Sequence, residues 1–462
     1  MAILSLGEVE GPLPAWAAPL LALAYVAGGF GLARAQAVLW RRVNRREDRD
    51  WASPRPRRRW MGLLALGVQL YLLAGLVGLL LLGWGGWVRH VLHLDSIPLV
   101  PEVVAALPFV AALLAYWHQL YPLDKVLRAG IGAFEPAADA PPAPTWTRRQ
   151  YIGFNVRHNL LFVAAPAAML ILAADLINRL GHVLPSAVLA GAALALSGAV
   201  FLAAPLLIVR MWKTVPLPEG DLRRALEAMC RAMRIRFREM MLWRTGGVIA
   251  NAAVLGLVGK TRYVLLTDAL VDNLSQAELE AVFAHEAGHV VHHHILYMVV
   301  MTVGLSMLLS AAGEAAEHAG LLASGWSDYV MLGAMATAWL PAFGYLSRRL
   351  EWQADAFAAA WMSRRLGGSG PGLTLEGVCV FNQALSAVAR LNGISVWHGN
   401  FRHGSIRHRR DRLMDLLMGD ENLADSTARL KHLQRGCWLL LLAGAAATAA
   451  VVGWAYGPPS LP

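Results

Sequence analysis

Long apolar blocks, separated by basic and polar connections, dominate the hydrophobic pattern of the chain. Eight blocks carry few or no charges, and most approach the roughly 20 residues that a membrane-spanning helix needs. They lie near Ala15–Ala33, Met61–Trp87, Pro98–Trp117, Leu160–Ala174, Val183–Val209, Ile295–Ala312, Tyr329–Leu346 and Cys437–Tyr456. The fourth block is the shortest and ends at Asp175. The pattern predicts a mainly α polytopic membrane protein with about eight transmembrane helices.

A different pattern follows the fifth block. Leu217–Met233 has the apolar spacing of a helix. Three short runs of β-type residues come next, at Phe237–Trp243, Val248–Leu257 and Tyr263–Thr267. A second helix begins at Ser275, which forms a capping box with Glu278, and we expect it to continue without a break into the sixth span. These elements predict a small α+β domain at the membrane edge.

Composition and charge support a membrane protein. Of the 462 residues, 57% are hydrophobic and only 16% are charged, which leaves too little polar surface for a soluble globule. The net charge of +10 could indicate nucleic-acid binding, yet all but two of the 41 Lys and Arg residues lie in alternate connections, at 34–60, 118–157, 210–294 and 347–436. That asymmetry is the positive-inside rule, so we expect these connections in the cytoplasm and both termini outside. The basic excess therefore needs no nucleic-acid partner.

Two further features concern the membrane and the redox state. Glu8 and Glu10 precede the first apolar block and no basic residue does, so we expect that block to stay as an anchor and not to be cleaved as a signal. Cys230, Cys379 and Cys437 are widely spaced, and we expect them to be free thiols.

The pentapeptide HEAGH at His285–His289 lies on the helix that begins at Ser275. Two histidines four residues apart project from one helical face and can hold one metal ion. Glu286 lies beside the first of them, where it can take a proton from a zinc-activated water and deliver it to the leaving amine. Gly288 leaves room for the close approach of another element or of substrate. An amphipathic helix with two interfacial histidines is the alternative, but the helix cap and the preceding strands favour catalysis.

Zinc needs a third protein ligand, and the residues just after HEAGH do not continue a known ligand pattern. Glu351 is the best candidate, because the seventh span returns the chain to the membrane face where the sixth begins; a solvated interfacial carboxylate is the alternative. Asp355, one turn later, can hydrogen-bond a ligand histidine. Glu314 and Glu317 compete with Glu351, but the topology places them at the far membrane face. For His292–His294 we favour interfacial packing over a metal-relay role.

Four segments resemble the integral-membrane zinc endopeptidases that include the type I CAAX prenyl protease and the HtpX heat-shock protease. They are NAAVLGLVGKTRYVLLTDAL (Asn251–Leu270), LSQAELEAVFAHEAGH (Leu274–His289), SRRLEWQAD (Ser347–Asp355) and RHGSIRHRRDRL (Arg402–Leu413). The resemblance implies that His285, His289 and Glu351 bind one Zn²⁺ and that Glu286 is the general base.

The same resemblance assigns roles to residues outside the zinc ligands. It implies that His403 and a following arginine stabilise the oxyanion. Spacing favours Arg409, while Arg407, Arg410 and Arg412 remain alternatives, and a basic surface patch is the alternative for the whole segment. Asn251 and Ala252 would line the cleft and hold substrate by strand addition.

We therefore predict an N-terminal membrane region at 1–209, a gluzincin-like zinc metallopeptidase domain at 210–436 that includes spans six and seven, and a C-terminal span and tail at 437–462. The predicted function is a multi-pass endopeptidase of the inner cell membrane that cleaves membrane-associated proteins or peptides at the cytoplasmic face. A metal transporter or sensor is an alternative, but it needs ionisable residues inside several spans, and almost none are found. An inactive client-binding scaffold would lack a ligand or the base. Prenylated tails, damaged membrane proteins and secreted peptides all remain possible substrates, and the Ala-, Leu- and Arg-rich composition looks bacterial, which favours the last two.

Overall fold

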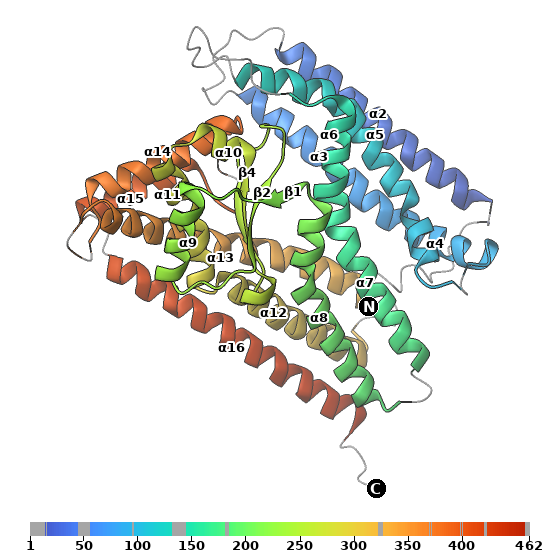
Figure 1. The fold of residues 1–462 in the computed structure, drawn as a ribbon. Helices are drawn as coiled ribbons and strands as arrows, with labels where there is room; N and C mark the ends of the chain where they lie inside the picture. Colours follow the sequence, from blue (N-terminus) through green and yellow to red (C-terminus); the bar gives the residue numbers. More distant parts are fainter. Residues whose placement is uncertain are drawn as a thin grey trace. The chain divides into compact units, whose positions relative to one another are not determined.

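The computed structural model describes residues 14, 16–44, 56–94, 97–131, 145–180, 184–321, 327–368, 370, 372–397, 399, 401–419 and 423–457. Glu8, Glu10, Ala15 and Val183, which enter the predictions above, lie outside these residues. Within them the chain is mainly helical with one small sheet, which confirms the predicted fold class (Figure 1).

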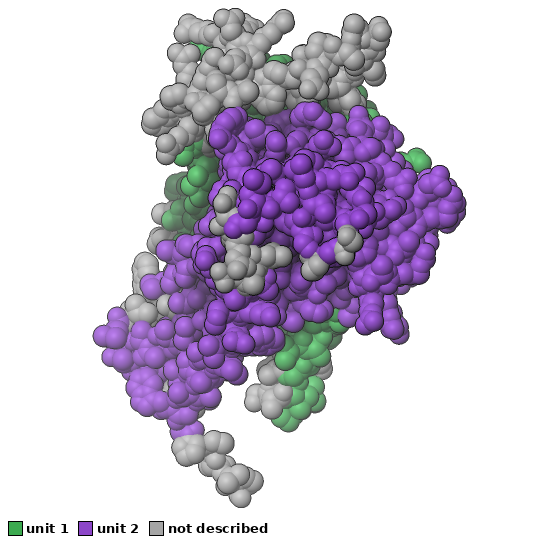
Figure 2. Space-filling view, turned by 90° about the vertical axis from the view of Figure 1, so that its left-hand side faces the viewer, with its two compact units in different colours: residues 1, 3–215, 243–249 green, residues 2, 216–242, 250–462 purple. Residues whose placement is uncertain are grey.

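Contacts within the chain divide it into two compact units, coloured separately in Figure 2. The first consists of Ile3–Val215 and Trp243–Ile249, and the second of Pro216–Leu242 and Ala250–Pro462. Helices of the first unit are α2 (Ala17–Asn44), α3 (Pro56–Leu81), α4 (Trp84–Gly86), η2 (Trp87–Val91), α5 (Val100–Ile131), α6 (Arg148–Asn155), η3 (Val156–Leu160), α7 (Leu161–Leu180) and α8 (Ser186–Met211).

Most of the remaining elements belong to the second unit. Its helices are α9 (Asp221–Ala232), η4 (Gly259–Thr261), α10 (Asp268–Asn273), α11 (Gln276–Val291), α12 (His294–His318), α13 (Ser327–Arg365), α14 (Leu375–Leu391), α15 (Ile406–Met418) and α16 (Leu423–Tyr456). The strands of the sheet are β1 (Thr214–Pro216), β2 (Glu239–Trp243), β3 (Ala252–Leu255) and β4 (Tyr263–Thr267).

Seven helical segments among the described residues are long and apolar enough to cross a membrane. Each contains most of one predicted span. The fourth is longer than its apolar block, because the polar residues before Leu160 continue the helix as a π-helical turn and the segment runs from Arg148 to Ile177. The predicted span Tyr329–Leu346 is helical, as the first half of α13, but is not one of the seven.

The four strands are ordered β1-β2-β4-β3. β3 and β4 are antiparallel, with Ala252 opposite Leu266 and Leu255 opposite Tyr263. Three of the strands fall inside the predicted β-type runs, while β1 was not predicted, because its three residues are too few to show alternation. β3 is the last strand in the order, so one of its edges is unpaired within the sheet.

A hydrophobic core fastens the sheet to the helices that carry the candidate site. Leu266 of β4, Phe283 of α11, Met362 of α13 and Phe381 of α14 are all at least 98% buried and belong to one cluster. Removing large apolar side chains from water is the main force that holds such elements together. α11, which carries His285 and His289, is thereby fixed in position.

Candidate metal centre

α11 begins where the sequence predicts. Ser275 Oγ accepts a hydrogen bond from the backbone N–H of Glu278, and a carboxylate oxygen of Glu278 accepts one from the N–H of Ser275 at 2.9 Å. The capping box is thus confirmed, and it satisfies backbone donors that the first turn leaves without partners.

The helix ends earlier than the sequence predicts. α11 stops at Val291, His293 has a left-handed backbone with φ of 55°, and α12 starts at His294. The expectation of one uninterrupted helix through His294 is therefore wrong. A non-glycine residue in this conformation costs about 1–3 kcal/mol and is found mostly where neighbouring contacts hold it.

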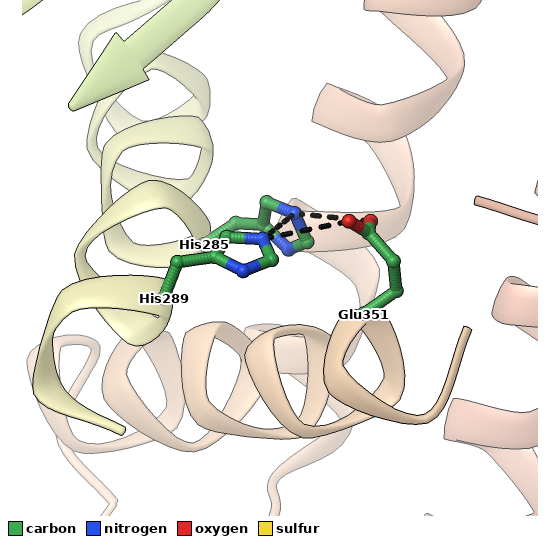
Figure 3. A group of neighbouring side chains, drawn as sticks. All are labelled: His285, His289 and Glu351. Carbon is green, nitrogen blue, oxygen red and sulfur yellow. Dashed lines mark hydrogen bonds and ion pairs between the residues drawn. The ribbon is translucent and has the colours of Figure 1, made fainter. Parts of the chain in front are cut away.

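Three side chains from two helices converge at one point. His285 and His289 project from α11, and Glu351 faces them from α13, as Figure 3 shows. The Nε2 atoms of the two histidines are 3.3 Å apart. The carboxylate oxygens of Glu351 lie 3.5 Å from His285 Nε2 and 3.6 Å from His289 Nε2. Tetrahedral donors about 2.1 Å from zinc would lie about 3.4 Å from one another. The spacing therefore fits a single zinc ion.

The rival carboxylates lie elsewhere. Glu314 and Glu317 are in the last turns of α12. Twenty helical residues separate Glu314 from His294, which corresponds to about 30 Å along the axis. Of these three carboxylates, only that of Glu351 is close enough to bind a cation held by the two histidines.

The charges around this point also suit a dication. When both imidazoles are neutral, as metal ligands must be, and Glu286 is ionised, the carboxylates of Glu286, Glu351 and Asp355 and the guanidinium of Arg409 leave two negative charges in excess. Glu351 and Asp355 are 4% and 2% exposed, and buried charge is stable only when it is compensated. Glu351 Oε2 is buried and lies 2.8 Å from His403 Nδ1 and 3.5 Å from His285 Nε2.

Asp355 contacts the ring nitrogen of His285 that faces away from Glu351, and Arg409 binds Asp355. His285 Nδ1 lies 2.9 Å from Asp355 Oδ1. Arg409, from α15, donates to both oxygens of Asp355, at 2.8 Å from Nε and 2.5 Å from Nη2. Its Nη1 lies 3.7 Å from Glu351 Oε2. Of the four arginines left open by the sequence, Arg409 is thus the one beside the ligands, and its hydrogen bonds go to Asp355.

The other three arginines make different contacts. Arg407 lies 3.4 Å from Asp411 and over the ring of Trp397, and Arg412 lies over the ring of Trp352. Arg410 lines a separate cavity of about 570 Å³. His403, by contrast, is at the centre: its Nδ1 lies 2.8 Å from Glu351 Oε2, and its side chain is 38% exposed.

The environment shifts the pKa of Glu286 and of both candidate ligand histidines. Desolvation raises the pKa of Glu286 to about 7, although the nearby charge of His285 opposes the shift. Burial lowers the pKa of His285, but Asp355 and Glu351 outweigh it and raise that pKa to about 10. Burial and the charge of His285 hold the pKa of His289 well below its usual range. Without a metal ion, the two carboxylates therefore favour a proton on His285, whereas His289 stays neutral. A bound cation would replace that proton, because a metal ligand must be a neutral imidazole.

The contact between His294 and the candidate ligand His289 was not predicted from the sequence. Its side chain is 3% exposed, its Nδ1 lies 2.7 Å from His289 Nδ1, and its Nε2 lies 2.8 Å from Gln353 Oε1. Because an amide oxygen only accepts, His294 carries its hydrogen on Nε2 and can accept at Nδ1 from His289. His289 then has its electron pair on Nε2, the atom that faces Glu351. The interfacial-packing interpretation is therefore wrong for His294, although His292 does pack edge-on against Phe357.

A cavity of about 340 Å³ opens beside the centre. Its lining includes His289, Glu351 and Arg402, and apolar residues of the two long helices, Ile295, Met298, Val299 and Val303 of α12 with Phe343 and Leu350 of α13. The lining combines polar groups of the centre with apolar side chains of the two helices, which suits a substrate with apolar character.

The predicted substrate-binding residues lie where the edge strand begins. Asn251 directly precedes β3, its N–H donates to Thr267 Oγ1 at 2.9 Å, and its carbonyl accepts from the N–H of Thr267 at 3.0 Å. Ala252 is the first residue of β3.

Comparison with known proteins gives a consistent set of relatives. Residues 216–369 match peptidase family M48. The chain is 27% identical over 169 residues to the CAAX prenyl protease 1 homolog of Arabidopsis thaliana, covering 33% of this chain and 40% of that protein. It is 33% identical over 103 residues to CAAX prenyl protease 1 of Saccharomyces cerevisiae, covering 21% and 22%. The matched segments thus span less than half of either relative.

Among solved structures, the crystal structure of Ste24p from S. mikatae is similar with a TM-score of 0.47 and 15% sequence identity. That alignment covers 88% of this chain and all of the Ste24p chain.

Proposed function

We propose that this membrane protein, whose residues 216–369 match peptidase family M48, is a zinc endopeptidase that cleaves membrane-associated proteins or peptides at the cytoplasmic face. The observation that carries the proposal is the convergence of His285, His289 and Glu351 within 4.8 Å of one another. The distribution of Lys and Arg supports the cytoplasmic position.

The chain supplies the ligands and the proton carrier. His285 and His289 would hold zinc through Nε2, and Glu351 through its carboxylate. Zinc, when bound, polarises a peptide carbonyl and lowers the pKa of water to about 7. Glu286 has a pKa near neutrality, so it can accept a proton from the attacking water and donate it to the leaving amine.

The remaining residues would orient these groups and the substrate. His403 is partly exposed and close to Glu351, so it can donate to the developing negative charge on the substrate oxygen. Arg409 holds Asp355 with a two-pronged hydrogen bond, and Asp355 in turn faces His285. We therefore assign Arg409 a positioning role. The unpaired edge of β3, next to Asn251 and Ala252, can receive a substrate in extended conformation.

The test is hydrolysis of a fluorescence-quenched peptide by the full-length, zinc-loaded protein in detergent. Glu286→Gln should lower kcat/KM about 10²- to 10⁴-fold and keep the zinc content of the wild type. Asp272→Asn, which removes an exposed carboxylate ahead of α11, is the matched control and should leave the rate unchanged. A Glu286→Gln protein that hydrolyses the peptide at the wild-type rate would refute the proposal.

A further inference from the structure

The pairing of β3 with β4 determines which backbone groups of β3 point away from the sheet. The N–H of Thr267 donates to the carbonyl of Asn251 at 3.0 Å, which continues the observed register by one pair. Successive residues of an antiparallel strand bind the partner strand and point away from it in turn. The N–H and C=O groups of Ala252 and Val254 therefore point to the unpaired edge, and those of Ala250 point to the same side.

The side chain of Asn392 occupies this edge at Ala250. Asn392 caps the C-terminus of α14. Its Oδ1 accepts a hydrogen bond from the N–H of Ala250 at 3.1 Å, and its Nδ2 donates to the carbonyl oxygen of Ala250 at 2.6 Å. A side-chain amide has both a carbonyl and an NH₂ group, so Asn392 pairs with Ala250 as the backbone of a neighbouring strand would.

Asn392 is itself held in place by its own helix. Its Nδ2 also donates to the carbonyl of Val388, one turn earlier in α14, at 2.9 Å. Two carbonyls face this end of the amide, and only the NH₂ group can donate to both, which fixes the orientation of the side chain. Ala250 is 2% exposed, and Asn392 engages both of its backbone groups. A substrate strand cannot pair there while Asn392 is in position.

The edge also ends at the other side of β3. Gly256, directly after the strand, has φ of 105°, a conformation that favours glycine, and its carbonyl accepts from Arg262 Nε at 3.1 Å. A Cβ at Gly256 would lie 2.6 Å from the carbonyl oxygen of Thr261, so the chain turns closely back on itself. Between the two ends, Ala252 and Val254 present both of their backbone groups to the unpaired edge.

We propose that Asn392 ends the substrate-binding edge of β3, so that the protein pairs with only about three consecutive substrate residues. The inference rests on the proposed function, in which an extended substrate adds to this edge. Two outward-pointing residues of β3 bind two substrate residues that are separated by one. Beyond Asn392 the substrate chain must leave the sheet edge. The favoured substrate is thus a polypeptide with a short extended segment, and not one that presents a long strand.

A scan of the substrate N–H groups tests this. The probe is a fluorescein-labelled peptide of about ten residues, longer than β3. It has one leucine among alanine, serine and threonine residues, so that the apolar cavity beside the centre fixes its register. Each N–H is replaced in turn by N–CH₃, which removes one donor. Binding to the full-length, zinc-loaded Glu286→Gln protein is measured by fluorescence anisotropy, which does not require hydrolysis.

We expect two sensitive positions, two residues apart, where methylation weakens binding about three- to tenfold. These N–H groups donate to the carbonyls of Ala252 and Val254. Adding Asn392→Ala should create a third sensitive position, two residues further along, because the carbonyl of Ala250 becomes available. Asn273→Ala is the matched control, since Asn273 ends α10 and donates to a carbonyl of its own helix four residues earlier. It should leave the two positions unchanged.

Three results would overturn the inference: three or more sensitive positions while Asn392 is intact, none at all, or the same pattern after Asn392→Ala. Should Asn392→Ala not fold, as judged by zinc content and thermal melting, Asn392→Ser replaces it. Its shorter side chain cannot reach both groups of Ala250, so the same third position is expected. Failure of the proposed function is distinguishable, because it would appear as absent hydrolysis by the wild type with the binding pattern retained.

Discussion

At the scale of single residues, the ring nitrogens of His294 connect the two helices of the metal centre. Nδ1 faces His289 on α11, and Nε2 faces Gln353 on α13. The left-handed backbone of His293 makes this possible, because it turns the chain back after the end of α11. The strain at His293 is thus located where it positions a candidate ligand.

His294→Ala should weaken zinc binding about 10- to 100-fold, since groups that orient a ligand imidazole contribute to metal affinity by such factors. Competition with a fluorescent zinc chelator measures it. His292→Ala removes a neighbouring histidine that packs against Phe357 and serves as the control. Equal zinc affinities for both variants and the wild type would mean that His294 has no positioning role.

Glu286 gives the reaction a defined pH dependence. A general base must be deprotonated, so kcat/KM should fall about tenfold per pH unit below the pKa of Glu286. Desolvation raises that pKa to about 7, and a bound dication lowers it. The acid limb should therefore have its midpoint at or below about pH 7. A pH–rate profile with its acid limb centred well above 7 would contradict the assignment.

The sequence predicts part of this centre. HEAGH identifies His285, Glu286 and His289 because helical periodicity alone puts both imidazoles on one face. Glu351 follows from the return of the chain through a membrane span. His294 could not be predicted, because its contact depends on a left-handed residue that no pattern marks. The choice of Arg409 among four arginines likewise depends on how α15 packs against α13.

At the scale of elements, α11 and α13 cross at Gly288. A Cβ added there would lie 3.2 Å from Ala354 Cα and 3.2 Å from Phe357 Cδ1. The predicted close approach of another element at Gly288 is thereby confirmed. The helix that packs against Gly288 is α13, which carries Glu351. This contact therefore sets the distance between Glu351 and the two histidines of α11.

Gly288→Val should push α13 away from α11. We expect it to destabilise the fold by about 1–3 kcal/mol and to weaken zinc binding, because Glu351 moves away from the histidines. Thermal melting and zinc competition measure the two effects. Gly198→Val, the same change at a helical glycine with no neighbouring atom within 4 Å of the added Cβ, should do neither. Unchanged melting and zinc affinity for Gly288→Val would contradict this role.

Element boundaries were predicted less well than element types. β4 has the predicted bounds, because turn residues flank it, whereas β3 is shorter than its run of β-type residues.

The membrane helices α12 and α16 lie side by side (Figure 1). A Cβ added to Gly444 would lie 2.6 Å from the carbonyl oxygen of Gly304, a close contact that small residues permit in membranes. Neither glycine carries a sequence signal that identifies its partner.

At the scale of the whole molecule, hydropathy and charge asymmetry carry the prediction. The resemblance drawn from four segments is confirmed by the match to family M48 and by both CAAX protease relatives. The membrane helices could be predicted because a segment that crosses lipid must make all its backbone hydrogen bonds internally, as a helix does. A long apolar stretch therefore indicates a membrane helix. The grouping of Trp243–Ile249 with the first unit depends on tertiary contacts and was not visible in the sequence.

Orientation in the membrane is testable by cysteine labelling. Asp272→Cys lies in a connection predicted to be cytoplasmic, and Leu92→Cys in one predicted to be outside; both positions are exposed. With the three native cysteines replaced, an impermeant maleimide added to intact cells should label Leu92→Cys alone. Asp272→Cys should react only after the membrane is opened. Labelling of Asp272→Cys in intact cells would reverse the proposed topology.

The central claim is that Glu351 completes a zinc site with two histidines from another helix. The most direct test is the zinc affinity of Glu351→Gln beside that of Glu314→Gln, measured by chelator competition on the full-length protein. The account predicts about one zinc per wild-type chain, retained by Glu314→Gln and bound at least about 100-fold more weakly by Glu351→Gln. Wild-type affinity in Glu351→Gln, or loss of zinc in Glu314→Gln, would contradict it.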